Sequence, residues 1–301
     1  MSIRKKESIK ERSVGERIAS ILIPTMITIY ALMCILPFIL VFIISFSSEK
    51  SITLNGYSFL PLEWSLSAYR MLFFKGSGLP RAYLITVCVT LVGTLVASFI
   101  TFGAGYALAN RNCKYRNNLA LYFYITMVFS TGLVPWYMIS KNLGCYDNII
   151  ALIVPSLMFS PFNMFLVRNF VKGIPEELDD SAKIDGAGDI AIAFKIYFPL
   201  CKAVLATIAL FYAIGYWNNY FNAAMLINNP DNYNLQMLLF KIQSEITALS
   251  KMATGAMGNT NPPKESFKMA MSIVTMGPII LLYPYLQKYF VKGMVVGAVK
   301  G

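Results

Sequence analysis

The chain has 301 residues, of which 56% are hydrophobic and only 14% are charged, and it contains no histidine. Soluble domains carry about 25% charged residues, so this composition indicates a protein that is largely surrounded by lipid. Without histidine there is no imidazole base, and no segment matches the phosphate-binding pattern GxxxxGK[ST]. We therefore expect no catalytic residue, no metal ligand and no bound cofactor in this chain.

Six apolar segments are long enough to cross a bilayer, which requires about 20 helical residues. The first follows a polar N-terminal segment, residues 1–17, and is too long for the core of a signal peptide, so we read it as an uncleaved span. The six predicted spans are residues 19–46, 82–109, 119–139, 149–167, 204–226 and 269–286. We expect Gly132 and Pro135 to break the third span, and the fourth contains Pro155 and Pro161.

Small residues recur every four positions along the second span. They are Gly93, Ala97, Thr101, Gly105 and Ala109. Such a seam lets a neighbouring helix approach closely, although chance alone can produce it in a sequence rich in small residues.

The most polar segment in the second half of the chain lies between the fourth and fifth spans, at residues 172–200. Pro175 suits the first turn of a helix, and Glu177 follows where the helix dipole favours a carboxylate. Gly186 can take the left-handed conformation that ends a helix, and a second helix can start near Ile190. The segment is therefore predicted to form a short helix, a glycine break and a second helix that leads back into the membrane.

A long polar excursion, residues 228–266, separates the last two spans. Within it, an apolar face at helical spacing predicts an amphipathic helix. This face consists of Leu235, Leu238, Ile242, Ile246 and Leu249. Two interpretations remain open, namely a helix packed on the membrane or on its own protein, and a docking surface for an external partner.

The distribution of positive charge predicts the orientation. With a cytosolic N-terminus, the inner segments hold 17 of the 26 Lys and Arg residues, although the outer loops are longer. The positive-inside rule therefore favours two cytosolic termini and a cytosolic central loop. The net charge of +11 is explained by topology, and nucleic-acid binding is not needed to account for it.

The predicted spans contain no Asp, Glu, Lys or Arg, which argues against a proton-driven carrier because such carriers use ionisable groups within the membrane. Their polar groups are neutral and are densest near the end of the fifth span. The candidates for a substrate pathway are Tyr216, Trp217, Asn218, Asn219 and Asn222. Amides beside aromatic rings suit an uncharged, hydroxyl-rich ligand, but the same side chains can serve helix packing and an interfacial aromatic belt.

The central loop resembles the EAA loop of ABC importer permeases. The resemblance rests on Asp180-Ser181-Ala182, on Ile184-Asp185-Gly186-Ala187 and on Phe198-Pro199-Leu200. Asp180 stands where Glu is usual, and Ser181 stands where Ala is usual. The segment 129–135, the Gly-Tyr-Trp-Asn sequence at 215–218 and the C-terminal sequence 292–301 are similar to carbohydrate permeases, and most similar to the smaller permease of maltose-type oligosaccharide importers.

The resemblance implies an all-α integral membrane protein with six transmembrane helices and the type I ABC importer permease fold, in the bacterial cytoplasmic membrane. Its implied partners are a second permease in a heterodimer, two ATPase subunits that use ATP and magnesium, and an extracellular sugar-binding protein. The cargo would be an oligosaccharide. The implied coupling residues are Glu177, Asp180, Ser181, Ala182, Asp185 and Gly186, and the implied ATPase contacts in the tail are Met294, Val295, Gly297 and Lys300.

We accordingly expect three segments. Residues 1–80 would hold the cytosolic N-terminus, the first span and an external segment, residues 81–291 the permease core, and residues 292–301 a cytosolic tail. Alternative functions are an ABC permease for another solute and, from a different class, a stand-alone secondary carrier.

Overall fold

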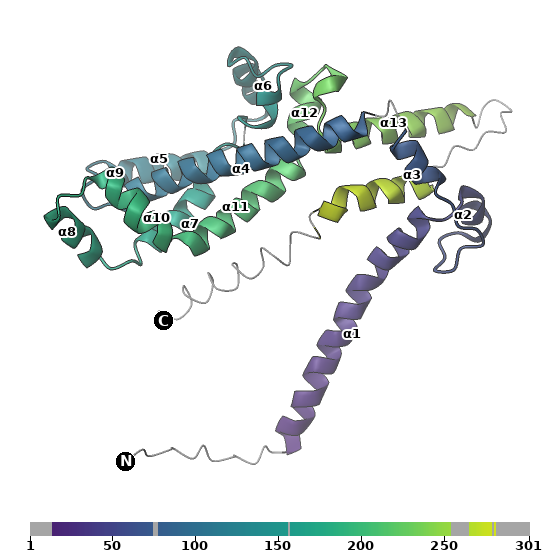
Figure 1. Ribbon diagram of the computed structural model, residues 1–301, viewed down its shortest axis with the longest axis horizontal. Helices are drawn as coiled ribbons and strands as arrows, with labels where there is room; N and C mark the ends of the chain where they lie inside the picture. Colours follow the sequence, from purple (N-terminus) through teal and green to yellow (C-terminus); the bar gives the residue numbers. More distant parts are fainter. Residues whose placement is uncertain (1–13, 75–77, 156, 254–264, 279, 281–301) are drawn as a thin grey trace. The chain divides into compact units, whose positions relative to one another are not determined.

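The computed structural model describes residues 14–74, 78–155, 157–253, 265–278 and 280, and within these ranges the chain is helical without a named strand (Figure 1). The elements are α1 (Val14–Ser45), α2 (Glu49–Asn55), α3 (Ser67–Leu72), α4 (Leu79–Ala109), α5 (Arg116–Val128), α6 (Leu133–Asn142), η1 (Ile149–Leu152), α7 (Pro161–Val171), α8 (Glu177–Ile184), α9 (Asp189–Ile192), the π-helical η2 (Ala193–Tyr197), α10 (Phe198–Leu200), α11 (Lys202–Trp217), α12 (Phe221–Leu226), η3 (Pro230–Asn232) and α13 (Leu235–Ala253). Residues 265–278 are also helical.

Two described helices are long and apolar enough to cross a membrane alone, and they comprise Ser20–Ser45 and Leu79–Ala109. Two bent pairs also qualify if each is taken as one span. These are Arg116–Val128 with Leu133–Asn142, bent by 117°, and Asp189–Leu200 with Lys202–Trp217, bent by 83°. The described part of the chain therefore contains between two and four candidate spans.

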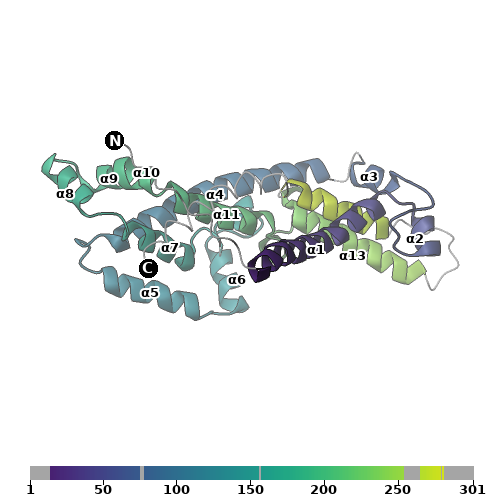
Figure 2. The same cartoon turned by 90° about the horizontal axis from the view of Figure 1, so that it is seen from below.

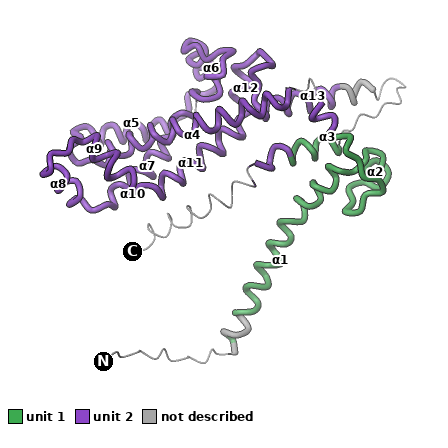
Figure 3. The backbone as a smooth tube through the Cα atoms, viewed as in Figure 1, with its two compact units in different colours: residues 1–69, 261–273 green, residues 70–260, 274–301 purple. Residues whose placement is uncertain are grey.

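The chain divides into two compact units, coloured separately in Figure 3. The first unit comprises residues 1–69 and 261–273, and the second comprises residues 70–260 and 274–301.

In the second unit, α4 is the helix on which the others pack, and α11 and α7 lie along it (Figures 1 and 2). The small-residue seam explains this packing. A Cβ atom at Gly93 would lie 2.6 Å from Cζ of Tyr216, and one at Gly105 would lie 2.7 Å from Cγ1 of Val167. Neither position has room for a side chain, so the predicted close approach of helices along this seam is confirmed.

A buried hydrogen-bonded group joins the same three segments. The Tyr212 hydroxyl on α11 lies 2.6 Å from Oγ1 of Thr101 on α4 and accepts a bond of 2.9 Å from the backbone N–H of Ser160, which precedes α7. Thr101 is fully buried and Tyr212 is almost so. Because buried polar groups must find partners, this group fixes the relative positions of the three helices.

The third predicted span is interrupted at Gly132, as expected. The helices on the two sides of this break are bent by 117°, so the segment is more than a slightly kinked helix. α5 ends at Val128, and Gly132 has a φ of +81°, at which an L side chain would be strained. α6 then starts in a new direction. The glycine supplies a backbone conformation that other residues rarely adopt, which explains why the helix breaks there.

The fourth and fifth segments are shorter as helices than predicted. Residues 149–167 contain only the 3-10 turn η1 and the first part of α7, because Pro155 and Pro161 prevent a continuous helix. Pro161 instead occupies the first position of α7 behind the capping Ser160. The predicted span 204–226 is divided into α11 and α12.

The amphipathic helix predicted in the excursion is present as α13. Leu235 and Ile246 are buried, Leu238 and Ile242 are partly buried, and α13 packs against α4. The N-terminal backbone of α13 is also tied to α4, since the Leu235 N–H donates to Oγ1 of Thr86 at 2.8 Å. The contacts thus favour packing on the protein itself over a free docking face.

In the first unit, Glu49 at the start of α2 caps the helix that begins at residue 265. Its carboxylate accepts hydrogen bonds from the N–H groups of Glu265 and Ser266, at 3.1 and 3.2 Å, and from the Ser266 hydroxyl at 2.9 Å. The first N–H groups of a helix have no partner within it, and a negative charge is favoured at this end. Glu265 in turn accepts a 2.8 Å hydrogen bond from the Tyr57 hydroxyl, which raises the pKa of Tyr57.

Candidate functional site

The central loop forms the helix pair that its sequence predicts. Glu177, Asp179 and Asp180 occupy the first turn of α8, where the positive end of the helix dipole stabilises them. α8 begins at Glu177, so Pro175 lies before the helix and not in its first turn as predicted. Residues 172–174 form a turn that leads the chain out of α7, and Glu176 rather than Pro175 takes the N-cap position of α8.

Gly186 ends α8 in the predicted conformation. Its φ is +81°, and its N–H donates to the Lys183 carbonyl at 3.0 Å, while the Ala187 N–H donates to the Ala182 carbonyl at 2.9 Å. These bonds satisfy carbonyl groups that the helix end would leave without partners. The chain then reverses, and α9 starts at Asp189 behind the N-cap Gly188, one residue before the predicted start.

One face of α8 rests on the protein and the other is exposed. Ala182 is the buried residue of the helix, at 7% exposure, and a larger side chain would lift α8 away from its support. The other predicted coupling residues, in α8 and at its C-terminal end, are exposed. They are Glu177, Asp180, Ser181, Asp185 and Gly186.

Two exposed apolar side chains flank the glycine break and were not among the predicted site residues. Ile184 is 86% exposed and Ile190 is 77% exposed. Ile184 lies outside the candidate spans, whereas Ile190 lies near the start of the bent pair Asp189–Leu200 with Lys202–Trp217. An isoleucine on each side of a glycine turn within an otherwise polar segment is the sequence signal that could have identified them.

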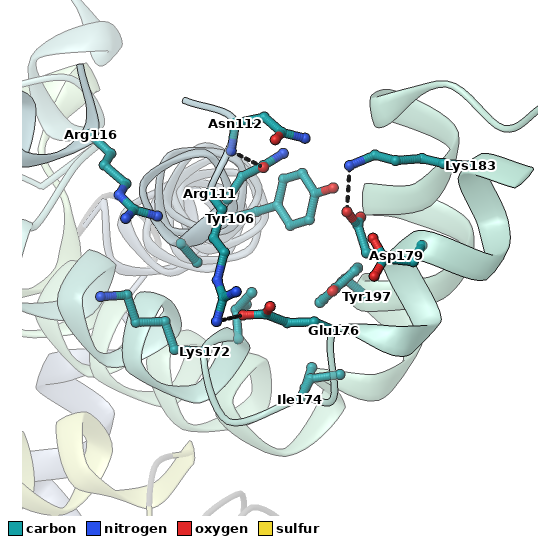
Figure 4. A pocket seen from close by; sticks show the side chains of 14 residues that line it. Tyr106, Arg111, Asn112, Arg116, Lys172, Ile174, Glu176, Asp179, Lys183 and Tyr197 are labelled. Atoms are coloured by element: carbon teal, nitrogen blue, oxygen red, sulfur yellow. Dashed lines mark hydrogen bonds and ion pairs between the residues drawn. The ribbon is translucent and has the colours of Figure 1, made fainter. Parts of the chain in front are cut away.

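A cavity of about 610 Å³ lies between this loop and the segment that links α4 to α5 (Figure 4). Two ion pairs are formed by residues that line this cavity. Arg111 Nη2 lies 2.5 Å from Glu176 Oε1, and Lys183 Nζ lies 2.5 Å from Asp179 Oδ2. The first pair joins the segment between α4 and α5 to Glu176, the N-cap residue of α8. The second pair lies within α8.

The titration of two lysines reflects these surroundings. The hydrogen bond to Asp179 raises the pKa of Lys183, since it favours the charged ammonium. Lys172, on the other side of the cavity, has a lowered pKa because burial disfavours its charge and because Arg168 and Arg116 are nearby. Of the three carboxylates that line the cavity at the α8 end, Glu176 and Asp179 are paired with described residues and Asp180 is not, while the other end carries Arg116 and Lys172, which are unpaired within the same residues.

The pathway candidates lie at the end of α11, directly after it and on α12, and the three most buried donate side-chain hydrogen bonds to carbonyls of other segments. Tyr216 donates to the Ile153 carbonyl at 3.1 Å, and Trp217 Nε1 donates to the Thr275 carbonyl at 3.1 Å. Asn222 Nδ2 donates to the carbonyls of Ala151 and Pro155, at 3.2 and 2.8 Å. All three are buried, which supports the packing interpretation of these residues.

The two remaining candidates are less buried as whole residues. Asn218 is exposed, and its Nδ2 donates to the Ile214 carbonyl at 3.0 Å. Asn219 has a buried Nδ2 atom that has no hydrogen-bond partner within the described residues. The predicted tail contacts Met294, Val295, Gly297 and Lys300 lie outside the described residues.

The sequence of the chain matches a known protein family. Residues 100–296 match the family described as the binding-protein-dependent transport system inner membrane component. The chain belongs to this family. Its members are the membrane permeases of ABC importers, the ATPase is a separate subunit, and the chain is a multi-pass protein of the cytoplasmic membrane.

Individual relatives agree with the family. Protein LplC of Bacillus subtilis (strain 168) is 39% identical over 269 residues, covering 89% of this chain and 90% of the relative. The polygalacturonan/rhamnogalacturonan transport system permease protein YtcP of the same organism is 36% identical, covering 95% and 99%. A solved bacterial ABC transporter involved in the import of the acidic polysaccharide alginate contains a similar chain, with a TM-score of 0.80, 29% identity and coverage of 93% and 99%. The similarity to the carbohydrate branch of the permeases is therefore confirmed.

Proposed function

We propose that this chain is one of two permease subunits of an ATP-driven importer of oligosaccharides. The proposal rests on its family and on the functions of its relatives, which include a permease for polygalacturonan and rhamnogalacturonan and a permease for arabinooligosaccharides. A second permease, two ATPases that bind ATP with magnesium, and an external sugar-binding protein complete the importer. Six spans with both termini in the cytosol belong to the same proposal, and the charge distribution supports them.

The coupling surface in this proposal is the exposed side of α8 and the glycine break behind it. It combines carboxylates at Glu177 and Asp180 with the exposed side chains of Ile184 and Ile190. An apolar centre with charged residues around it is the usual composition of a protein interface. ATP-driven movement of the ATPase would shift α8 and, through Ala182 and the ion pair of Arg111 with Glu176, the helices behind it.

The cargo pathway in this proposal is neutral and polar. The predicted spans have no charged residue, so recognition of sugar would use amides, hydroxyls and aromatic rings. Asn218 and Asn219 are the side chains that we assign to the pathway, because Asn218 is exposed and Asn219 is partly exposed, whereas Tyr216, Trp217 and Asn222 are buried and bonded to other segments.

The decisive experiment is purification of the full chain from its native membrane in mild detergent, followed by identification of the proteins that accompany it. We expect an ATPase and a second permease in near-equal amounts, with ATP hydrolysis that increases when the binding protein carries an oligosaccharide. A chain that purifies alone and transports solute without an ATPase would refute the proposal and favour the secondary carrier.

A variant on the exposed side of α8 tests the proposed coupling surface separately. Ile184→Ser should leave the amount of chain in the membrane unchanged, because the side chain is 86% exposed, and should weaken retention of the ATPase. Ala182→Leu should weaken it as well, by displacing α8. Unchanged ATPase retention in Ile184→Ser would remove this residue from the proposed interface.

A further inference from the structure

The cavity beside α8 has an uneven charge distribution that the proposed coupling role does not use. Its acidic residues lie toward α8, where Glu176 is paired with Arg111, Asp179 is paired with Lys183, and Asp180 forms no ion pair with a described residue. Arg116 and Lys172 lie on the side of the cavity away from Asp179 and Lys183 (Figure 4). Neither cation forms an ion pair with any residue that the structure describes.

A third cation strengthens this positive end. Arg168 lies one turn before Lys172 at the end of α7, and it is near enough, with Arg116, to disfavour the charge on Lys172. The Arg168 Nε atom is buried and has no hydrogen-bond partner within the ranges described above. Two unpaired cations that line a cavity, beside a third cation whose buried Nε atom has no hydrogen-bond partner in the described residues, indicate a site for an anion.

The position of these cations indicates the kind of anion. Arg116 is the first residue of α5, where a candidate membrane segment meets a polar loop, and Lys172 directly follows α7 at the start of the central loop. Leu119, one turn after Arg116 on the same face of α5, is exposed. The cavity wall also includes the apolar side chains of Val171 and Ile174. A ligand that fits has a negatively charged head and a hydrocarbon body.

We infer that Arg116 and Lys172 bind the headgroup of an anionic phospholipid at the cytosolic end of α5 and α7, with Arg168 adding positive charge beside them. The phosphate lies between the cations and accepts their hydrogen bonds, while the acyl chains lie along the exposed apolar face of α5. A zwitterionic lipid fits less well, because its ammonium group meets the same positive charge. Basic pockets between helices at the cytosolic surface are a known type of site for anionic lipid headgroups.

The test measures lipid retention on the full chain, purified in detergent in its importer complex and equilibrated with vesicles. One set of vesicles contains phosphatidylcholine alone, and the other contains equal parts of phosphatidylcholine and phosphatidylglycerol. Native mass spectrometry then counts the lipids that remain bound. The parent complex should retain phosphatidylglycerol in preference to phosphatidylcholine, and Arg116→Gln/Lys172→Gln should lose this preference several-fold.

The matched control is Lys114→Gln/Lys195→Gln, which removes two exposed lysines from the neighbouring linker and from the central loop, outside the cavity. Control and parent should retain the lipid equally, and Arg116→Lys/Lys172→Arg should keep the preference because both charges remain. If the double glutamine variant does not fold, the two single variants carry the test.

Two results would overturn the inference. One is equal retention of phosphatidylglycerol by the double glutamine variant and the control. The other is loss of a partner subunit from the double variant with lipid retention unchanged, which would assign the cations to a protein carboxylate. Both readings come from the same spectra and need no transport, so they are independent of whether the cargo is an oligosaccharide.

Discussion

The ring of Tyr216 lies directly over Gly93, and a Cβ atom at that position would approach its Cζ to 2.6 Å. α4 and α11 can therefore pack at this distance only because residue 93 has no side chain. The Tyr216 hydroxyl is fixed at the same time by its bond to the Ile153 carbonyl, so the ring has little freedom to move aside.

The first prediction concerns this contact. Gly93→Ala should destabilise the helix packing by about 1–3 kcal/mol, because overpacking forces the ring or the backbone to shift. Gly103→Ala is the matched control, since it lies on the same helix with no atom within 4 Å of an added Cβ. Thermal unfolding in detergent should show a lower Tm for the variant at position 93 only, and equal values would contradict the close packing.

A second prediction concerns the buried hydroxyl of Tyr212. Tyr212→Phe leaves the Ser160 N–H without its acceptor and the Thr101 hydroxyl without its partner, at a cost of about 1–3 kcal/mol. Tyr220→Phe serves as the control because that side chain is 47% exposed. The melting temperatures of the two variants check the prediction, and a similar loss in both would show that the buried group contributes no more than a surface hydroxyl.

A third prediction uses the glycine break after α8. Gly186→Ala places a side chain at a φ of +81°, which costs about 1–2 kcal/mol locally and should move the end of α8. Gly188→Ala is unstrained, because Gly188 has a φ of −75° and open space around it. Cargo-stimulated ATP hydrolysis should fall in the first variant and not in the second, with equal amounts of both chains in the membrane. Equal activities would separate Gly186 from coupling.

A fourth prediction concerns the sign of the charge at Asp180. Asp180→Lys should lower transport and coupled ATP hydrolysis without changing insertion, because the residue is exposed and the altered charge faces the proposed ATPase contact. Asp180→Glu keeps the charge and should retain activity. Full uptake by Asp180→Lys would contradict the assignment of α8 as the coupling helix.

A fifth prediction concerns the ion pair of Arg111 and Glu176. Their side chains are 73% and 51% exposed, so the pair should contribute only about 0.2–1 kcal/mol to stability. Its effect on coupling should be larger, because it joins the α4–α5 link to the segment before α8. Arg111→Glu should reduce coupled ATP hydrolysis, and the exchange Arg111→Glu/Glu176→Arg should restore part of it. If the exchange is no better than the single variant, the pair has no coupling role.

Much of the second unit was predictable because the signals were local. A spacing of four residues was enough to predict the seam on α4. An acidic first turn and a glycine that can adopt a positive φ were enough to predict α8. The helix over residues 235–253 followed from its apolar period. The course of residues 149–160 was less predictable, since an apolar composition does not distinguish a helix from a buried turn between two prolines.

The functional side chains were less predictable than the elements that carry them. The sequence could place Tyr216, Trp217 and Asn222 together, but it could not show that carbonyls of distant segments already occupy their donors. The exposure of Ile184 and Ile190 likewise depends on which side of the helix pair rests on the protein. Both properties arise from tertiary packing, so spacing alone does not contain them.

The Glu49 cap has a consequence for the order in which the protein is assembled. Its carboxylate and the Glu265 N–H that it binds are separated by 216 positions in the sequence. Glu49 therefore leaves the ribosome long before its partners are synthesised, and its charge remains hydrated until nearly the whole chain exists. Long-range contacts of this kind form late. The helix at residue 265 therefore gains its cap only after residues 265 and 266 have been synthesised and have reached Glu49.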